Sequence, residues 1–194
     1  MPFTLAAPAH SELIIRKSRF VGCVQPVADR TAAQAVVAAL RIAHPGAAHV
    51  CWALMAGGQS AANDDGEPGG TAGRPMLEVL RHHQLESVLA TVVRYFGGVK
   101  LGAGGLVRAY TDSVAQALAG AELIALVPQR QLQCAVPYAF EGLVRREIAA
   151  IGATLVDVRH EGLVRFSISL AAPAAEAFIA RLDDAAQGRV AWTL

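Results

Sequence analysis

The chain has 194 residues, of which 54% are apolar and 17% are charged, and its formal net charge is +1. This composition indicates a globular chain that is long enough for one large domain or two small ones, in which any basic surface must be local. No apolar run approaches the roughly 18 residues of a membrane-spanning helix, and residues 1–5 have no features of a secretory signal. Three widely spaced cysteines without a Cys-x-x-Cys motif predict a reduced, cytoplasmic protein.

The first half of the chain alternates predicted strands and helices. The apolar run at residues 88–94 is typical of a strand in the centre of a sheet. Residues 57–70 are expected to form a long loop, and the element order β-β-α-β-α-β-α favours an α/β arrangement in two layers. Further strands are predicted at 12–17, 19–27 and 49–56, and helices from Asp29 or Thr31 to His44, from Thr71 or Gly73, and from about Gly105 to Glu122.

A break at Val127-Pro128 separates two predicted domains, residues 1–127 and 128–194. Residues 164–170 alternate apolar and polar side chains, which predicts a half-buried strand. The order of elements beyond the break, β-α-β-β-α-β, is that of a ferredoxin-like domain. The other strands are expected at 131–136, 154–159 and 190–193, and the helices over 140–151 and around 178–182.

The most informative stretch, residues 63–110, holds half of the chain's 18 glycines and begins with three carboxylates, Asp64, Asp65 and Glu67. Carboxylates this close repel one another unless water, a cation or a basic partner lies nearby. They therefore indicate a Mg²⁺ site, a receptor for backbone amides, an acidic face opposite Arg94 and Lys100, or a solvated turn. The ligand spacing of a Ca²⁺-binding loop is absent.

A glycine-rich loop over residues 96–105 is predicted between a strand and a helix. This placement offers backbone N–H groups and a helix N-terminus to an anion. A P-loop would continue with Lys-Ser or Lys-Thr, and a dinucleotide-binding motif would end in a further glycine. This loop has neither, so it matches neither nucleotide-binding motif. If Arg108 does not bind an anion, it is expected to form an ion pair with Asp112, four residues further along the helix. The candidate anion-binding residues of this region are Arg94, Tyr95, Lys100, Gly104, Gly105 and Arg108.

Tyr95 and Phe96 follow Arg94 directly and have two interpretations. Both rings are expected either to pack in the core or to stack on nucleic-acid bases, for which an arginine and a lysine nearby are suitable. His44, His49 and Cys51 lie close in sequence, but no fourth ligand for a zinc ion is visible. No nucleophile with a catalytic partner can be identified.

Two long motifs carry a resemblance to the YigZ/IMPACT family. Residues 63–75 match Ser-Asp-Asp-Gly-Glu-Pro-x-Gly-Thr-Ala-Gly-x-Pro, with Asn63 in place of the serine. Residues 92–110 match Val-Val-Arg-Tyr-Phe/Tyr-Gly-Gly followed by Leu-Gly-x-Gly-Gly-Leu-Val-x-Ala-Tyr. The earlier segments 17–20, 44–45 and 49–52 also fit the family, so the resemblance covers both predicted domains.

The resemblance implies a first domain like domain IV of translation elongation factor G and a ferredoxin-like second domain similar to its domain V. Those domains contact RNA on the ribosome, and eukaryotic members of the family bind a protein activator of a stress kinase. No catalytic residue is established for the family, so none is assigned to this chain. Neither the binding surface nor an oligomeric state is implied.

These observations lead to a non-enzymatic protein that binds RNA or the translation machinery, with Arg94, Lys100 and Arg108 facing a phosphate-bearing partner. One alternative is an enzyme that handles phosphate esters or nucleotides with Mg²⁺ held by Asp64, Asp65 and Glu67. Another is a regulatory module whose acidic loop binds a basic protein. No other cofactor is expected. All three interpretations require the acidic and glycine-rich segments to form a single charged groove.

Overall fold

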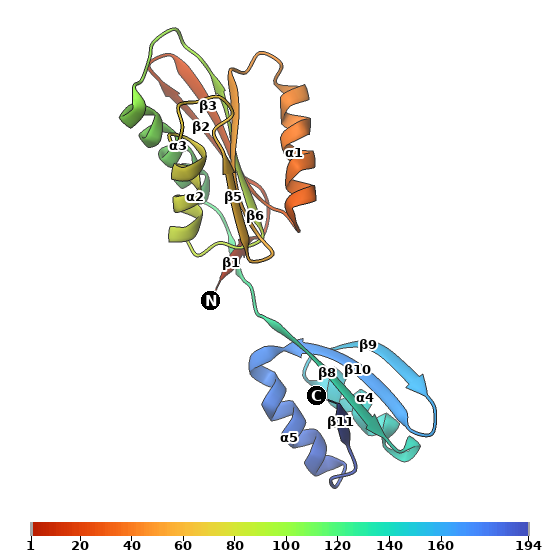
Figure 1. Ribbon diagram of the computed structural model, residues 1–194. Coiled ribbons are helices and arrows are strands. Elements are labelled where there is room, and N and C mark those ends of the chain that lie inside the picture. Colours follow the sequence, from red (N-terminus) through yellow and green to blue (C-terminus); the bar gives the residue numbers. More distant parts are fainter. Residues whose placement is uncertain (1, 194) are drawn as a thin grey trace. The chain divides into compact units, whose positions relative to one another are not determined.

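The computed structural model describes residues 2–193, and the chain divides into two compact units, Met1–Leu126 and Val127–Leu194 (Figure 1). The first unit is built on a five-stranded sheet with the strand order β2-β3-β6-β4-β5, in which every neighbouring pair is antiparallel. The strands are β2 (Ala9–Ile15), β3 (Ser18–Pro26), β4 (His49–Ala56), β5 (Gln59–Asn63) and β6 (Val88–Tyr95).

The central position predicted for the apolar strand at 88–94 is confirmed by β6. Its residues from Val88 to Arg94 are all buried, and it pairs with β3 on one side and β4 on the other. A strand with neighbours on both edges and covered faces needs apolar side chains in both directions, which this run supplies.

Helices cover both faces of the sheet, so the predicted two-layer arrangement is wrong. Helix α1 (Arg30–Ala43) lies on one face, and α2 (Gly73–His82) and α3 (Ala103–Leu118) lie on the other (Figure 1). Along β4, Val50 and Leu54 join the core beneath α1, whereas Cys51 and Ala53 join the core beneath α2 and α3. The middle strands are apolar on both sides, and each apolar face must be buried against a separate helical layer.

Part of the loop expected at 57–70 is instead the edge strand β5. It pairs with β4 through a two-residue turn, Gly57-Gly58, in which both glycines have positive φ. This Gly-Gly pair is a hairpin signal, but β5 has no apolar residue larger than alanine and carries no apolar alternation. The structure also contains a small antiparallel ribbon, β1 (Phe3–Leu5) with β7 (Leu123–Ala125), and α3 ends at Leu118 rather than near Glu122.

The second unit contains the predicted order β-α-β-β-α-β. Its four strands form an antiparallel sheet in the order β11-β8-β10-β9. The half-buried pattern predicted for residues 164–170 is confirmed, since Val164, Phe166 and Ile168 are buried in the core of this unit. The elements are β8 (Gln129–Val136), α4 (Glu141–Ala150), β9 (Thr154–His160), β10 (Val164–Ala171), α5 (Ala175–Ala185) and β11 (Ala191–Thr193), with short 3-10 turns at Tyr138–Phe140 and Ala172–Ala174.

None of the helices within residues 2–193 combines the length and the hydropathy required to cross a bilayer.

Candidate functional site

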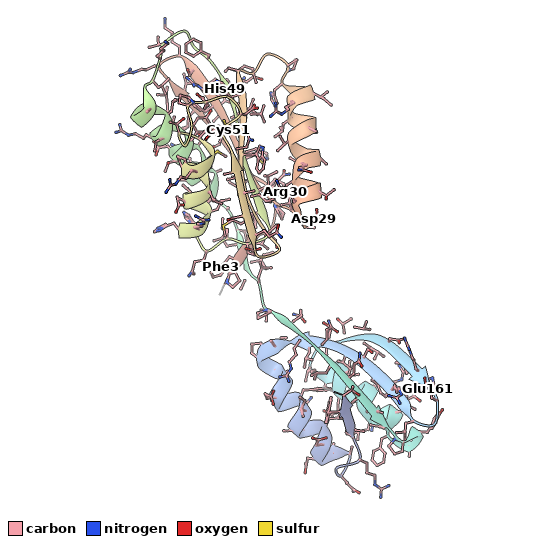
Figure 2. All side chains as sticks on the ribbon, viewed as in Figure 1. Phe3, Asp29, Arg30, His49, Cys51 and Glu161 are labelled. Atoms are coloured by element: carbon pink, nitrogen blue, oxygen red, sulfur yellow. The ribbon has the colours of Figure 1, made fainter. Side chains whose placement is uncertain are left out.

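The two glycine-rich segments meet at one end of the first unit. Here β6 ends at Tyr95 and β4 begins at His49, whose register partner is Arg94. Figure 2 labels His49 and Cys51 on β4 at this end. The contact between the segments is direct, since Nη1 of Arg94 lies 2.5 Å from Oε1 of Glu67.

Glu67 and Arg94 are buried rather than displayed. Their side chains are 3% and 5% exposed, and Oε1 of Glu67 also accepts a hydrogen bond of 2.8 Å from the Tyr110 hydroxyl. The Cys51 thiol lies 3.3 Å from the same hydroxyl and 3.0 Å from the carbonyl oxygen of Asp64. A buried ion pair is tolerated when further hydrogen bonds satisfy its free positions, and Tyr110 supplies one of them.

Tyr110 is not among the candidate site residues identified from the sequence, so its polar contact with Glu67 was missed. A fully buried tyrosine hydroxyl requires a hydrogen-bond partner, which was the available signal.

Arg94 is held in place by aromatic rings. Its guanidinium carbon lies 5.3 Å from the centre of the Phe20 ring and 5.6 Å from that of Phe96, and Nη2 donates to Oγ of Ser18 at 3.4 Å. Its Nε atom is buried without a partner among the described residues. The expected role of Arg94 as a surface cation for phosphate therefore does not fit its position, because the residue is desolvated and its charge is already opposed by Glu67.

Asp64 closes the N-terminal end of α2. Its carboxylate accepts backbone N–H groups from Gly70 at 2.7 Å, Ala72 at 3.0 Å and Gly73 at 2.8 Å. Partial burial works against the charged form, but these three hydrogen bonds prevail and lower the pKa of the Asp64 carboxyl from its usual value. Of the alternatives considered for the acidic loop, Asp64 therefore fits the one in which a carboxylate receives backbone amides.

Asp65 joins the acidic loop to β4 and α1. Its Oδ2 accepts the Val50 N–H at 2.6 Å, its Oδ1 lies 2.5 Å from Nη2 of Arg41, and its carbonyl oxygen is 2.8 Å from Nδ1 of His49. The three loop carboxylates therefore face three different sets of partners. Within residues 2–193, no group of three or more His, Cys, Asp or Glu side chains is arranged to hold a metal ion.

Some of the remaining candidate residues pack against other side chains, and others are exposed to solvent. The Tyr95 hydroxyl lies 2.7 Å from Nδ1 of His44, and the Arg19 guanidinium lies 5.7 Å from the centre of the Tyr95 ring. Gly104 and Gly105 form the first turn of α3 after Gly102, whose φ is +73°. Lys100 and Arg108 are exposed, and the described residues contain no ion pair between Arg108 and Asp112.

A basic hairpin turn lies against the glycine loop and was not identified from the sequence as part of the site. Arg16 and Lys17 connect β2 to β3 with φ values of +47° and +67°. A Cβ atom added at Gly97 would overlap the carbonyl carbon of Lys17 and the amide nitrogen of Ser18. The loop backbone therefore approaches the turn so closely that only glycine fits at position 97.

Comparison with known proteins agrees with the two motifs. Residues 16–118 match the family model described as Impact N-terminal domain, and residues 134–189 match one described as Domain of unknown function (DUF1949). The chain is similar to IMPACT family member YvyE of Bacillus subtilis (34% identity over 190 residues, 96% of this chain and 88% of that protein). It is also similar to IMPACT family member YigZ of Escherichia coli (34% identity over 188 residues, 94% and 92%).

A crystal structure described as that of a hypothetical protein has the same fold, with a TM-score of 0.78 and 33% sequence identity over 98% of this chain and 95% of that one. The two matched motifs, both matched regions and the relatives that align with nearly the whole chain lead to one conclusion: this chain belongs to the IMPACT family.

Proposed function

We propose that this chain is a non-enzymatic binding protein that engages RNA, free or within the translation machinery, through one basic end of its first unit. IMPACT family membership supports a role related to translational regulation in general terms. The basic end is defined here as Arg16, Lys17, Lys100 and Arg108.

The close approach of Gly97 to the Lys17 backbone carries this proposal. It joins the turn that bears Arg16 and Lys17 to the loop that bears Lys100, although the two segments are about 80 residues apart in sequence. All four cations of the basic end are exposed, and none takes part in an ion pair within residues 2–193. Unpaired surface cations are available to neutralise phosphates and release their counterions.

Two of the three loop acids at this end are already paired with cations of the protein, and the third is bound by backbone amides. Glu67 is buried against Arg94, Asp65 is paired with Arg41, and Asp64 is hydrogen-bonded to backbone amides. Each carboxylate is thus occupied by a protein partner, whereas Lys17 and Lys100 face solvent. This asymmetry favours an anionic ligand over the basic protein partner considered for the acidic loop.

Phe96 adds an aromatic surface beside the cations. Its side chain is 52% exposed, while its ring lies over the guanidinium of buried Arg94. Exposed aromatic rings stack on unpaired bases, and each such stacking interaction contributes about 1–3 kcal/mol. Arg94 then has a positioning role, since it supports the ring from the interior instead of contacting phosphate.

The environment of Cys51 supports a binding role over a catalytic one. Burial is the main cause that raises the pKa of the Cys51 thiol to about 12, so the sulfur stays protonated near neutral pH. A neutral, buried thiol is a weak nucleophile, and its neighbours Tyr110 and Glu67 are engaged with each other.

The finer fold assignments belong to the same proposal. The strand order β11-β8-β10-β9 supports a ferredoxin-like second unit, and the resemblance to elongation factor G assigns the two units to the classes of its domains IV and V. A fold shared with ribosome-binding domains favours RNA as the ligand but does not locate a site.

A salt titration with labelled single-stranded RNA and with purified ribosomes tests the proposal. Lys100→Ala and Arg108→Ala are each expected to flatten the dependence of log K on log salt by about 0.7 to 1 unit for each phosphate that is no longer neutralised. The matched control is Arg30→Ala, an exposed arginine at the start of α1, near the opposite end of the sheet. Slopes that stay the same in all three variants would remove the support for this site.

A further inference from the structure

A second surface of the first unit is formed where α2 and α3 lie side by side (Figure 1). Between the two helices runs an open groove with a volume of about 660 Å³, hereafter the α2/α3 groove. Its floor consists of Pro75 and Val79 from α2 and of Val107 and Ala115 from α3. None of these residues takes part in the buried Glu67–Arg94 pair or in the basic end.

The two helices run in the same direction, because each begins near the end of the sheet that carries the basic end and finishes near the start of β6. The shorter helix, α2, has 10 residues and is therefore about 15 Å long. A groove of this length accommodates roughly three turns of a third helix laid between them.

The floor of the groove is aliphatic and partly open to water. Val107 is 38% exposed, so part of this aliphatic floor is accessible to a ligand. Thr111 and Ala115 follow it along the same side of α3 and are small enough to let another helix approach to about 8–10 Å. Burial of such a stripe by a complementary helix would be favourable.

On its α2 side the groove carries the positive charge of Arg74. Arg74 and the neighbouring His82 and His83 line its α2 side. Among the described residues, Glu78 is the one acid in the lining, and its Oε1 is paired with Nη1 of Arg81 at 2.8 Å. The charge left for a ligand is therefore positive, and it is complementary to acidic side chains.

We infer that the α2/α3 groove docks an amphipathic helix of a protein partner, with aliphatic residues on the floor and acidic residues beside Arg74 and His82. Within the part of the chain that the structure describes, no Phe, Tyr or Trp lines the groove, so it lacks the rings on which bases stack, in contrast to the basic end with Phe96. An aliphatic stripe at i, i+3, i+4 and i+7 on the partner is the pattern that fits such a groove.

A displayed library of helical peptides tests this inference without knowledge of the natural partner. The library is selected on the intact chain and counter-selected on Val107→Glu, which places a charge on the floor. The expected result is enrichment of amphipathic helices with a net negative charge. Enrichment of basic or non-helical peptides, or no enrichment at all, would overturn the inference.

Affinities of the selected peptide then locate its site. Val107→Glu is expected to weaken binding at least tenfold, whereas Ile42→Glu, an equivalent change at an exposed aliphatic residue of α1, should leave it unchanged. Arg74→Glu should weaken binding by several-fold more than Arg30→Glu, and the difference should shrink at high salt.

If each groove variant weakened peptide binding no more than its control, the peptide would bind elsewhere, and the groove assignment would be contradicted. Protection of the Val107 and Ala115 amides by single-stranded RNA would assign the surface to nucleic acid instead. The salt titration that tests RNA binding changes other residues, Lys100 and Arg108. Failure of the groove assignment would therefore not decide whether the basic end binds RNA.

Discussion

Arg94 and Glu67 form an ion pair inside the first unit, with 2.5 Å between Nη1 and Oε1 and with side chains that are 5% and 3% exposed. The acidic and glycine-rich segments are thus joined by an internal pair, and they do not present opposite charges across an open groove. The surface that remains for a ligand is the basic end, where the four cations have no carboxylate partner among the described residues.

Removal of one member of this pair should destabilise the first unit strongly. We expect Glu67→Ala to lower its free energy of unfolding by about 3–5 kcal/mol, because an uncompensated guanidinium would remain buried. Urea denaturation followed by Trp52 fluorescence in a Trp192→Phe background measures this unit. The control is Glu12→Ala, which breaks the exposed pair with Arg19 and should cost far less, because solvent screens exposed ion pairs. If the two variants lost similar amounts of unfolding free energy, the internal pair would contribute no more to stability than an exposed pair.

The Asp64 carboxylate should make the stability of the first unit sensitive to acid. Its pKa in the folded state is lowered, so its stabilisation is complete above the unfolded-state value of about 3.9 and is lost as the pH falls through the folded-state pKa. Asp64→Asn is expected to cost about 1–3 kcal/mol at neutral pH and less near pH 3. Denaturation curves at the two pH values check this, and a cost independent of pH would contradict it.

Two glycines of the second motif should respond to alanine with opposite signs. Gly97→Ala is expected to destabilise the chain by about 1–3 kcal/mol or more, because the added methyl overlaps the Lys17–Ser18 peptide. Gly104→Ala places a methyl in open space within α3 and should stabilise it by up to about 1 kcal/mol. Thermal unfolding of both variants is the measurement, and a neutral Gly97→Ala would disprove the close approach of turn and loop.

The cysteines should differ in their reactivity. Burial raises the pKa of Cys51 to about 12 and that of Cys134 to about 11, and both are buried, whereas Cys23 is only partly buried. Alkylation near neutral pH, followed by mass spectrometry, should modify Cys23 first and should reach the other two only in denaturant. Rapid labelling of Cys51 in the native protein would show that its environment is open.

Regular apolar patterns made much of the fold predictable. The run at 88–94 identified the central strand, and the alternation at 164–170 identified a half-buried one. The strand β5 was missed because it lies at a sheet edge and is held mainly by a glycine turn and backbone pairing, with Ala61 as its one apolar contact to the core.

The site was harder to predict, because its contacts join residues that are distant in sequence. Arg94 follows a run of buried strand residues, which is unusual for a surface cation, but only the folded chain shows that Glu67, 27 residues earlier, is its partner. The basic turn at Arg16 and Lys17 contains neither Gly nor Asn, so its positive φ values have no local sequence signal.

The most direct test of RNA binding at the basic end replaces Arg16-Lys17 by Asn-Gly. This pair suits a turn with positive φ at both positions, so the variant loses two charges while its stability is retained or rises by up to about 1 kcal/mol. We predict weaker binding of single-stranded RNA and a dependence of log K on log salt that is flatter by about 1.5 units. Unchanged affinity and slope in this stably folded variant would contradict RNA binding at the basic end.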